Sequence, residues 1–296
     1  MTEQTAPVGM VGLGVMGAAM SANLIAAGFE VRGYDVAPER CRQFAAAGGS
    51  VESSAAEVGS QADVVIFSLP SAPALEEVAA EVAAAGRAGL ICVETGTLPL
   101  DVKLAAREVL AGAGIGLMDV PLSGTGLQAA DATLVAFASG SPAAFERVRP
   151  VLGAICRSIH YLGEFGNGSM MKYIANLLVA IHNLSTAEAH VLGLAAGLDP
   201  QVVQTVMSDG VGSSKIFDIR GPMMVADLYD PPAARLDIIL KDARIISDYA
   251  RSVGAVTPLL DRAIGIYEES SSAGLGSLDA AALCRFLEMR SGVIRP

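Results

Sequence analysis

Residues 8–35, VGMVGLGVMGAAMSANLIAAGFEVRGYD, decide the predicted fold. The apolar run at 8–13 predicts a buried strand, and a helical pattern follows it to about Ala27, where Gly28 can end the helix. Residues 29–35 predict a second strand. A strand, a helix and a strand in this order are typical of a parallel sheet with helices packed on it.

Three glycines between the first strand and the helix, Gly12, Gly14 and Gly17, have the spacing GxGxxG. The first allows a tight turn, the second lets the backbone approach a pyrophosphate, and the third lets helix and strand pack closely. The N-terminus of the helix would face the phosphates with its N–H groups. The motif alone is weak evidence, but between a strand and a helix it predicts a dinucleotide site.

Asp35 ends the second predicted strand, about 20 residues after the glycine motif. A carboxylate at this place can accept hydrogen bonds from the ribose hydroxyls and would repel a 2′-phosphate, so NAD is favoured over NADP. Arg40 nearby weakens that preference without reversing it. A turn-forming role for the Asp35 side chain is the structural alternative.

Four further strands are predicted, at residues 63–69, 89–94, 115–120 and 133–139. The loops after the first two contain Leu69, Pro70 and Thr97, and such loops bind ligands in open parallel sheets, so we expect them beside the nicotinamide. The glycine-rich loop after the third strand contains Ser123. Its hydroxyl and the N–H groups after it could bind a carboxylate, and an ordinary loop is the alternative.

Residues 166–197, GNGSMMKYIANLLVAIHNLSTAEAHVLGLAAG, predict one long helix, which Ser169 can cap and Gly197 can end. At 1.5 Å per residue it would be about 45 Å long, enough to run from one domain into the next. Its apolar content suggests a membrane span, but its polar side chains would be costly in lipid, so we expect a buried core helix. These side chains are Asn176, His182, Asn183, Glu188 and His190.

Lys172 and Asn176 lie four residues apart near the start of this helix and therefore share one face. One interpretation is a lysine that reaches solvent along an apolar surface. The other is a proton donor with a hydrogen-bonding neighbour. These two residues alone leave both interpretations open.

The chain has 296 residues, enough for two domains, and a net charge of −11. This acidity argues against nucleic acid and membrane surfaces as partners but allows a small anionic substrate. The four cysteines show no CxxC spacing and the three histidines form no metal motif, so we expect no bound metal and reduced thiols in a cytosolic protein. The first residues lack the basic region of a signal peptide, which also favours a cytoplasmic location.

After Gly197 the pattern predicts an all-helical second half. The expected helices are at residues 200–208, 222–226, 236–253, 258–270 and 279–289. Residues 211–219, which contain Gly212, Ser213 and Ser214, are expected to form a loop that could border a cleft.

Four motifs in order identify a resemblance that covers nearly the whole chain: GLGVMGAAMSANL, DVPLSGTGLQAADATL, GNGSMMKYIAN and LKDARIISD. Together they resemble the β-hydroxyacid dehydrogenase family, which includes 3-hydroxyisobutyrate, tartronate semialdehyde and L-threonate dehydrogenases. The resemblance implies an α/β fold with a doubly wound Rossmann domain at residues 1–165 and an all-helical substrate and dimerisation domain at 166–296, joined by the long helix. It also implies an active site in the cleft between the domains. The apolar helical half suggests at least a dimer, so we expect a homodimer or homotetramer.

The resemblance assigns a role to each matching residue. Lys172 resembles the catalytic lysine and Asn176 its orienting partner, while Lys241 resembles a lysine that closes over substrate and cofactor. Ser123, Gly124 and Thr125 resemble the substrate-binding Ser-Gly-Gly element. The remaining residues that resemble NAD contacts are Leu13, Val15, Met16, Leu69, Pro70 and Thr97.

Three positions depart from the family pattern: Thr125 replaces the third residue of Ser-Gly-Gly, Ala132 a frequent glycine, and Glu94 the usual aspartate. These changes bear on the substrate more than on the reaction. The expected reaction is hydride transfer between NAD and a small 3-hydroxy acid, with Lys172 as general acid and base.

Three alternatives remain open at this point. One is a semialdehyde or glyoxylate reductase of the same fold that uses NADPH. Another is an imine reductase, although that branch generally has Asp or Tyr in place of Lys172. A third is a dinucleotide-sensing module without activity, which the presence of the lysine disfavours.

Overall fold

The computed structural model describes residues 7–85 and 87–295. The expectation about a signal peptide concerns residues 1–6, which lie outside this part of the chain. Contacts divide the chain into two units, Met1–Lys172 and Tyr173–Pro296, which are described separately below.

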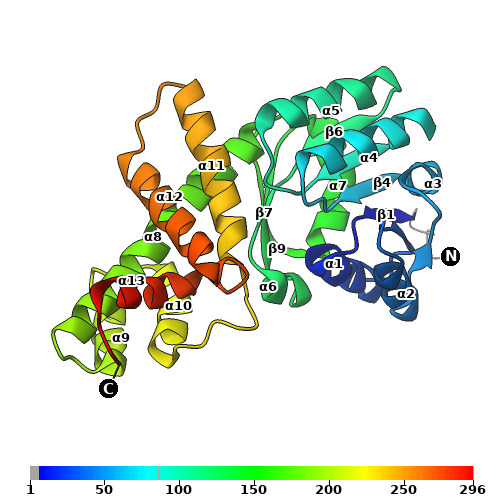
Figure 1. The fold of residues 1–296 in the computed structure, drawn as a ribbon. Helices are drawn as coiled ribbons and strands as arrows, with labels where there is room; N and C mark the ends of the chain where they lie inside the picture. The colour runs from blue at the N-terminus through cyan, green and yellow to red at the C-terminus, as the bar shows by residue number, and fades with distance from the viewer. Residues whose placement is uncertain (1–6, 86, 296) are drawn as a thin grey trace. The chain divides into compact units, whose positions relative to one another are not determined.

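The first unit is built on a six-stranded sheet with the order β3-β2-β1-β4-β5-β6, in which every neighbouring pair is parallel (Figure 1). Its strands are β1 (Val8–Val11), β2 (Val31–Tyr34), β3 (Ser50–Val51), β4 (Val64–Phe67), β5 (Ile91–Glu94) and β6 (Gly116–Asp119). The order reverses between β1 and β4, and the crevice at the carboxyl ends of such strands is where doubly wound sheets bind ligands. The predicted strands are confirmed, each two or three residues shorter than expected.

Helices cover both faces of this sheet. One core joins α1, α2 and α7 to one face through residues such as Leu24, Phe44 and Val148, and a second joins α3, α4 and α5 to the other through Val58, Leu75 and others. The helices are α1 (Val15–Ala26), α2 (Pro38–Ala46), α3 (Ala55–Gln61), α4 (Ala72–Ala85), α5 (Leu100–Gly112) and α7 (Pro142–Gly153). Strands buried on both faces explain the continuous apolar runs of the sequence.

A smaller three-stranded sheet completes the first unit, with the order β7-β8-β9. It consists of β7 (Leu122–Ser123), β8 (Leu134–Ala138) and β9 (Cys156–Tyr161), and the short helix α6 (Gly126–Ala130) follows β7. Strand β9 was not predicted from the sequence, because its residues do not alternate regularly between buried and exposed positions. Asn23 of α1 donates a 2.6 Å hydrogen bond to the Ala129 carbonyl, which ties α6 to the first helix of the glycine motif.

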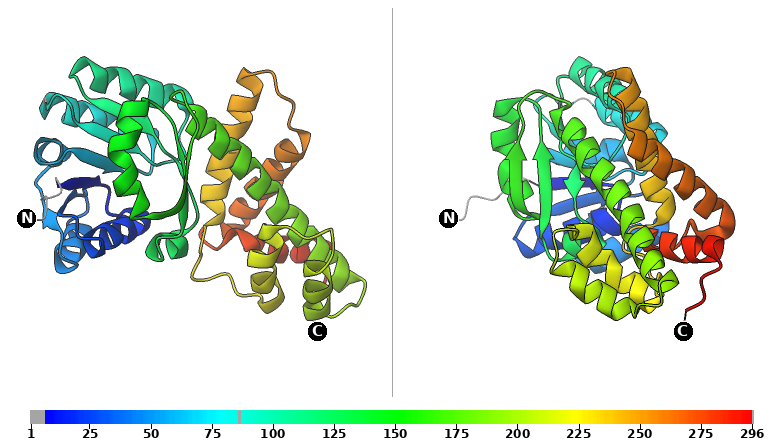
Figure 2. Two further views of the ribbon diagram at one scale, coloured as in Figure 1. Left: turned by 180° about the vertical axis from the view of Figure 1, so that it is seen from behind. Right: turned by 90° about the vertical axis from the view of Figure 1, so that its left-hand side faces the viewer.

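The long predicted helix is confirmed as α8 (Asn167–Ala195), which begins in the first unit and continues into the second (Figure 2). Gly197 ends it in the left-handed conformation, with φ +77°, and the N–H of Leu198 bonds back to the Gly193 carbonyl. The prediction that Ser169 caps the helix is wrong. The helix starts two residues earlier, and Ser169 instead hydrogen-bonds Asp119.

The second unit contains the rest of α8 and further helices around one core that includes Leu240, Tyr267 and Leu283. They are α9 (Pro200–Ser208), α10 (Lys215–Ala226), α11 (Leu236–Ser252), α12 (Pro258–Ser270), the π-helical η1 (Ser271–Leu275), the 3₁₀ turn η2 (Ala280–Ala282) and α13 (Leu283–Ser291). The predicted loop at 211–219 is wrong after Ser214. This serine caps α10 by accepting from the Phe217 N–H, and the helix continues through Pro222.

Within the described residues, α8 is the one helix whose length and composition would allow it to cross a membrane. Core helices of soluble proteins pass the same test, and 44% of its most apolar window is buried inside the fold, so this is weak evidence for a span.

Candidate active site

The glycine motif forms a tight cradle at the point where the sheet order reverses. Gly12 has φ +91°, and a β-carbon there would lie 2.3 Å from the Ser68 carbonyl oxygen after β4. A β-carbon on Gly17 would lie 1.9 Å from the Gly12 carbonyl oxygen. Neither position accepts a side chain without movement of backbone, so the close approach of turn, helix and strand that the motif predicts is present.

Gly14 plays a different part in this cradle. A β-carbon there would make an ordinary van der Waals contact, 3.9 Å from Arg40 Nη1, and Gly14 precedes α1 without a side-chain cap. The backbone is therefore accessible at the N-terminus of a helix, where a phosphate is favoured by N–H groups and by the helix dipole. Val15 in the first turn of α1 is 77% exposed and offers apolar contact beside this position.

Asp35 lies just after β2 and is buried, and its carboxylate is held by the backbone. Oδ2 accepts the N–H of Leu13 at 2.8 Å, and Oδ1 accepts the N–H of Ala37 at 2.8 Å. Arg40 Nη1 lies 3.3 Å from Oδ2. The carboxylate thus links the second strand to the glycine turn, while Val36 beside it is 82% exposed and could contact an adenine ring.

The loops after β4 and β5 lie together. The N–H and hydroxyl of Thr95 both donate to the Phe67 carbonyl, the hydroxyl at 2.7 Å, and a β-carbon on Gly96 would lie 3.4 Å from the Leu69 carbonyl oxygen. Leu69 is half-buried and Pro70 is exposed. The predicted cofactor residues of these two loops therefore share one edge of the sheet, the edge that carries the glycine motif.

The Ser123 loop approaches the glycine motif through α6. Gly124 has φ +140°, and a β-carbon on Gly126 would lie 2.7 Å from the Val15 side chain. The N–H of Thr125 already donates to Gln128 Oε1 at 2.8 Å in a capping box. This bond engages the Thr125 N–H, so that N–H does not bind a carboxylate in this conformation. The Ser123 hydroxyl and the Gly124 N–H are the remaining candidates in that loop.

The start of α8 is fixed to the carboxyl end of β6. The N–H and the hydroxyl of Ser169 donate to the two oxygens of Asp119, each at 2.8 Å. Next to them, the Gly168 N–H donates to Ser139 Oγ at 2.9 Å. Lys172 follows Ser169 by three residues and lies on the same helix face, half-buried. The first unit therefore contains Lys172 together with the glycine motif and the Ser123 loop.

Under this helix start lies a fully buried group of charges. Lys103 Nζ of α5 is 2.5 Å from Glu94 Oε2, 2.9 Å from Asp119 Oδ1 and 2.8 Å from the Gly96 carbonyl oxygen. Burial lowers the pKa of Lys103, but the two carboxylates raise it by more, so the ammonium stays charged. Burial also raises the pKa of Glu94, against the opposing effect of Lys103.

In the second unit, one carboxylate holds two predicted site residues. Asn176 Nδ2 donates to Asp242 Oδ2 at 2.8 Å, and Lys241 Nζ lies 2.9 Å from Asp242 Oδ1. Asp242 is buried, whereas the Lys241 side chain is 38% exposed. Sequence reasoning gave Asp242 no role, although it stands next to Lys241 in the LKDA motif. Its position in the motif marked Asp242 as a candidate, but the sequence did not reveal its contact with Asn176, which lies 66 residues away.

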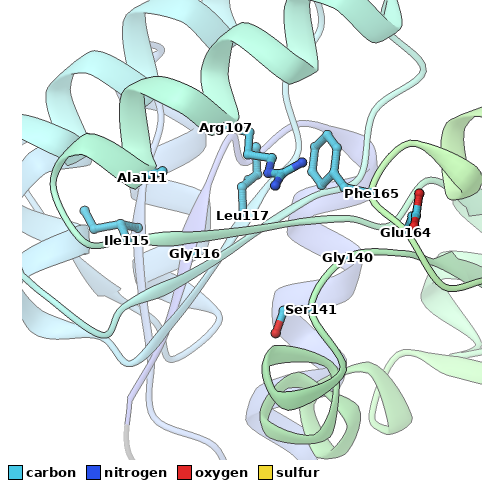
Figure 3. Close-up of a pocket in the computed structure, with 9 residues that line it drawn as sticks. All are labelled: Arg107, Ala111, Ile115, Gly116, Leu117, Gly140, Ser141, Glu164 and Phe165. Carbon is cyan, nitrogen blue, oxygen red and sulfur yellow. The ribbon is translucent and has the colours of Figure 1, made fainter.

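A separate cavity of about 510 Å³ lies beside the start of β6 (Figure 3). Arg107 lies over the Phe165 ring, 5.2 Å from its centroid, and Ser141 and Glu164 add polar groups. The residues that line this cavity include none of the predicted cofactor or substrate residues, so we do not assign the active site to it.

The geometry defines a dinucleotide-binding domain joined to a helical unit, the architecture of a nicotinamide-dependent dehydrogenase. Comparison with known proteins agrees. The family model for the NAD binding domain of 6-phosphogluconate dehydrogenase matches residues 7–163, and that for the NAD-binding of NADP-dependent 3-hydroxyisobutyrate dehydrogenase matches 166–287. The chain therefore belongs to the β-hydroxyacid dehydrogenase family and is an NAD(P)-dependent oxidoreductase.

Individual relatives cover almost the full chain. L-threonate dehydrogenase of Cupriavidus necator is 35% identical over 94% of this chain and 95% of its own. Glyoxylate/succinic semialdehyde reductase 2 of Arabidopsis thaliana is 30% identical over 96% of this chain and 80% of its own. The structure of Mycobacterium tuberculosis 3-hydroxyisobutyrate dehydrogenase with L-serine is similar with a TM-score of 0.88, at 30% identity, over 95% of this chain and 99% of that one.

Proposed function

We propose that this enzyme transfers a hydride between NAD and the hydroxyl carbon of a small 3-hydroxy acid similar to 3-hydroxyisobutyrate. The observation that carries the proposal is the anchoring of α8. Its first turn is bonded through Ser169 to Asp119 at the carboxyl end of β6, the sheet edge that also carries the glycine motif. Lys172 lies one turn farther along that helix, in the same unit as the cofactor cradle.

Lys172 is the proposed general base in oxidation and general acid in reduction. Its neutral amine would take the proton of the substrate hydroxyl as the C–H hydrogen leaves as hydride, and its ammonium would return that proton in the reverse direction. The nicotinamide, when bound, accepts or supplies the hydride. Asn176 is proposed to hold the substrate oxygen, with its amide orientation fixed by Asp242.

The substrate carboxylate is proposed to bind Ser123 and Gly124, through the hydroxyl and the backbone N–H respectively. Thr125 would shape this loop, because its own N–H is engaged by Gln128. Lys241 is proposed to add a positive charge for the anionic substrate and for the cofactor, and Asp242 would orient its ammonium group.

For the cofactor, we propose the glycine cradle of Gly12, Gly14 and Gly17 for the pyrophosphate and Asp35 for the adenosine ribose. The further proposed contacts are Leu13, Val15, Met16, Leu69, Pro70, Thr97 and Lys241. The buried Asp35 carboxylate supports NAD over NADP, because a 2′-phosphate beside it would meet a negative charge.

Three further points belong to the proposal. We take residues 1–165 as the cofactor-binding domain and 166–296 as the substrate and dimerisation domain. We expect a homodimer or homotetramer, since the second unit exposes apolar side chains such as Leu259 and Val256. We also expect a cytoplasmic enzyme that acts on small anionic molecules rather than on nucleic acid or membranes, in keeping with the net charge of −11.

A second candidate is a reductase of glyoxylate or a semialdehyde that uses NADPH. The observation in its favour is Arg40, whose guanidinium lies between Asp35 and the Gly14 backbone and could bind a phosphate. Steady-state assays with NAD and NADP side by side, against 3-hydroxyisobutyrate, glycerate, threonate and serine, and in reverse against glyoxylate and succinic semialdehyde, separate the two. A kcat/KM for NAD at least tenfold above that for NADP with a 3-hydroxy acid supports the first proposal. The opposite preference with an aldehyde supports the second.

A further inference from the structure

The buried charge group of Glu94, Lys103 and Asp119 connects two parts of the proposed site that are far apart in sequence. Glu94 ends β5, directly before the loop that carries Thr97, and its Oε1 accepts the Gly96 N–H at 2.7 Å. Asp119 ends β6 and accepts both donors of Ser169 at the start of α8. Lys103 lies between the two carboxylates and also donates to the Gly96 carbonyl.

We propose that this buried group positions the general acid/base and the nicotinamide loop relative to each other, with Asp119 and Ser169 acting on Lys172 and Glu94 acting on residues 95–97. The inference rests on the proposed function, because it takes Lys172 as the proton-transfer group. None of the buried residues would contact substrate, so they are positioning residues.

The hydrogen-bond chemistry shows why these groups suit the task. Each Asp119 oxygen accepts two groups: Oδ1 accepts from Lys103 and Ser169 Oγ, and Oδ2 accepts from the Ser169 N–H and Ser139 Oγ. A carboxylate is needed, because an amide nitrogen in place of either oxygen could not accept. The negative charge also lies at the N-terminus of α8, where the helix dipole favours it.

The packing leaves this helix start little freedom. All three charged side chains are fully buried. A β-carbon on Gly168 would lie 2.3 Å from the Phe137 carbonyl oxygen and 2.8 Å from that of Asp119. The first turn of α8 therefore lies against backbone of β6 and β8, and a shift of that turn would carry Lys172 with it. Proton and hydride transfer depend on such placement to within about 1 Å.

The two ends of the group can be tested separately. Ser169→Ala removes the hydroxyl bond to Asp119 on the helix side. Glu94→Gln acts on the loop side, since a glutamine can present an acceptor to Gly96 or to Lys103 but not one oxygen to each. Ser270→Ala is the matched control: Ser270 is equally buried and donates to a helix carbonyl in α12 at 2.7 Å. Ser139→Ala, which removes the bond to the Gly168 N–H, is the second helix-side variant if Ser169→Ala does not fold.

Three readouts on the full-length enzyme decide the question: amide hydrogen exchange of residues 166–173, kcat with saturating hydroxy acid, and Kd for NADH. We expect Ser169→Ala to speed exchange in that segment and to lower kcat about tenfold or more, with Kd changed less than about threefold. Glu94→Gln should raise Kd about tenfold and leave exchange at 166–173 near the wild-type rate. Ser270→Ala should change none of the three.

Two results would overturn the inference alone: faster exchange in Ser169→Ala with kcat within about threefold of wild type, or unchanged exchange in both helix-side variants. Equal losses in all three readouts for Ser169→Ala, Glu94→Gln and Ser270→Ala would show a purely structural role and would also overturn it. Wild-type protein that turns over no hydroxy acid with either cofactor would instead overturn the proposed function, while the exchange data would still report whether the helix is anchored.

Discussion

The side-chain amide of Asn176 donates a 2.8 Å hydrogen bond to Asp242, which fixes the orientation of the amide that we propose to hold the substrate oxygen. The other oxygen of the same carboxylate holds the Lys241 ammonium at 2.9 Å. One buried aspartate therefore controls two of the residues that we propose to contact the substrate.

Asp242→Asn should lower kcat/KM for the hydroxy acid about tenfold or more, because an amide nitrogen would replace one of the two acceptor oxygens. Kd for NADH should stay within about twofold, since Lys241 is the one proposed cofactor contact in the second unit and the adenosine and pyrophosphate contacts lie in the first. The measurement is initial rates together with NADH fluorescence titration. Asp248→Asn, on the same helix but in an exposed pair with Arg251, is the control and should leave both values unchanged. Unaltered kcat/KM in Asp242→Asn would remove Asp242 from the proposed site.

Gly17→Ala should weaken NADH binding about tenfold or more. Its β-carbon would lie 1.9 Å from the Gly12 carbonyl oxygen, so the pyrophosphate turn must move. We also expect a loss of about 1–3 kcal/mol in the free energy of unfolding from the overpacking. Gly112→Ala in α5, which has open space around its β-carbon, should affect neither quantity. NADH affinity equal to wild type in Gly17→Ala would show that this turn does not hold the cofactor.

Lys103→Met should destabilise the protein by about 3–5 kcal/mol, because it leaves two buried carboxylates without their cation. Urea unfolding followed by circular dichroism gives the value. Arg244→Met removes an exposed ion pair with Glu268 and should cost less than about 1 kcal/mol. Similar losses for the two variants would mean that the buried charges are far better solvated than the structure shows.

His190 should make the protein less stable in mild acid. Burial lowers the pKa of this histidine below its ordinary value of 6.5, against a hydrogen bond to Gln204 that raises it. The unfolded chain therefore binds a proton near pH 6.5 that the folded chain takes up only at lower pH, so the free energy of unfolding falls as the pH drops through that range. Urea titrations between about pH 7.5 and about pH 5.5 measure the slope.

His190→Gln should flatten this pH dependence, whatever its effect on stability at neutral pH. His160→Gln changes an exposed histidine of β9 and serves as the control. An unchanged slope in His190→Gln would assign the acid sensitivity to other groups.

Local patterns predicted the parts of the site whose geometry depends on near neighbours. Gly12 and Gly17 lie close together across one turn, so their spacing in the sequence was enough to predict the tight turn between β1 and α1. The strands were found because burial on both sheet faces makes them continuously apolar.

Sequence patterns did not predict the contacts of residues whose partners lie far along the chain. Ser169 is of a residue type that often caps helices, but its partner is Asp119, 50 residues earlier. Lys103 likewise pairs with Asp119 of a strand 16 residues later, a contact that no local pattern predicts. In the second half, the Gly-Ser run at residues 212–214 suggested a loop up to residue 219, whereas the Ser214 cap and tertiary packing maintain helix α10 from Lys215 onward.

The most direct test of the account is turnover of a saturating 3-hydroxy acid with saturating NAD by Lys172→Ala, beside wild type and the exposed-lysine control Lys215→Ala. If Lys172 transfers the proton, kcat should fall at least about a hundredfold while NADH still binds with near wild-type Kd, and Lys215→Ala should match wild type. Turnover by Lys172→Ala within tenfold of wild type would contradict the central claim.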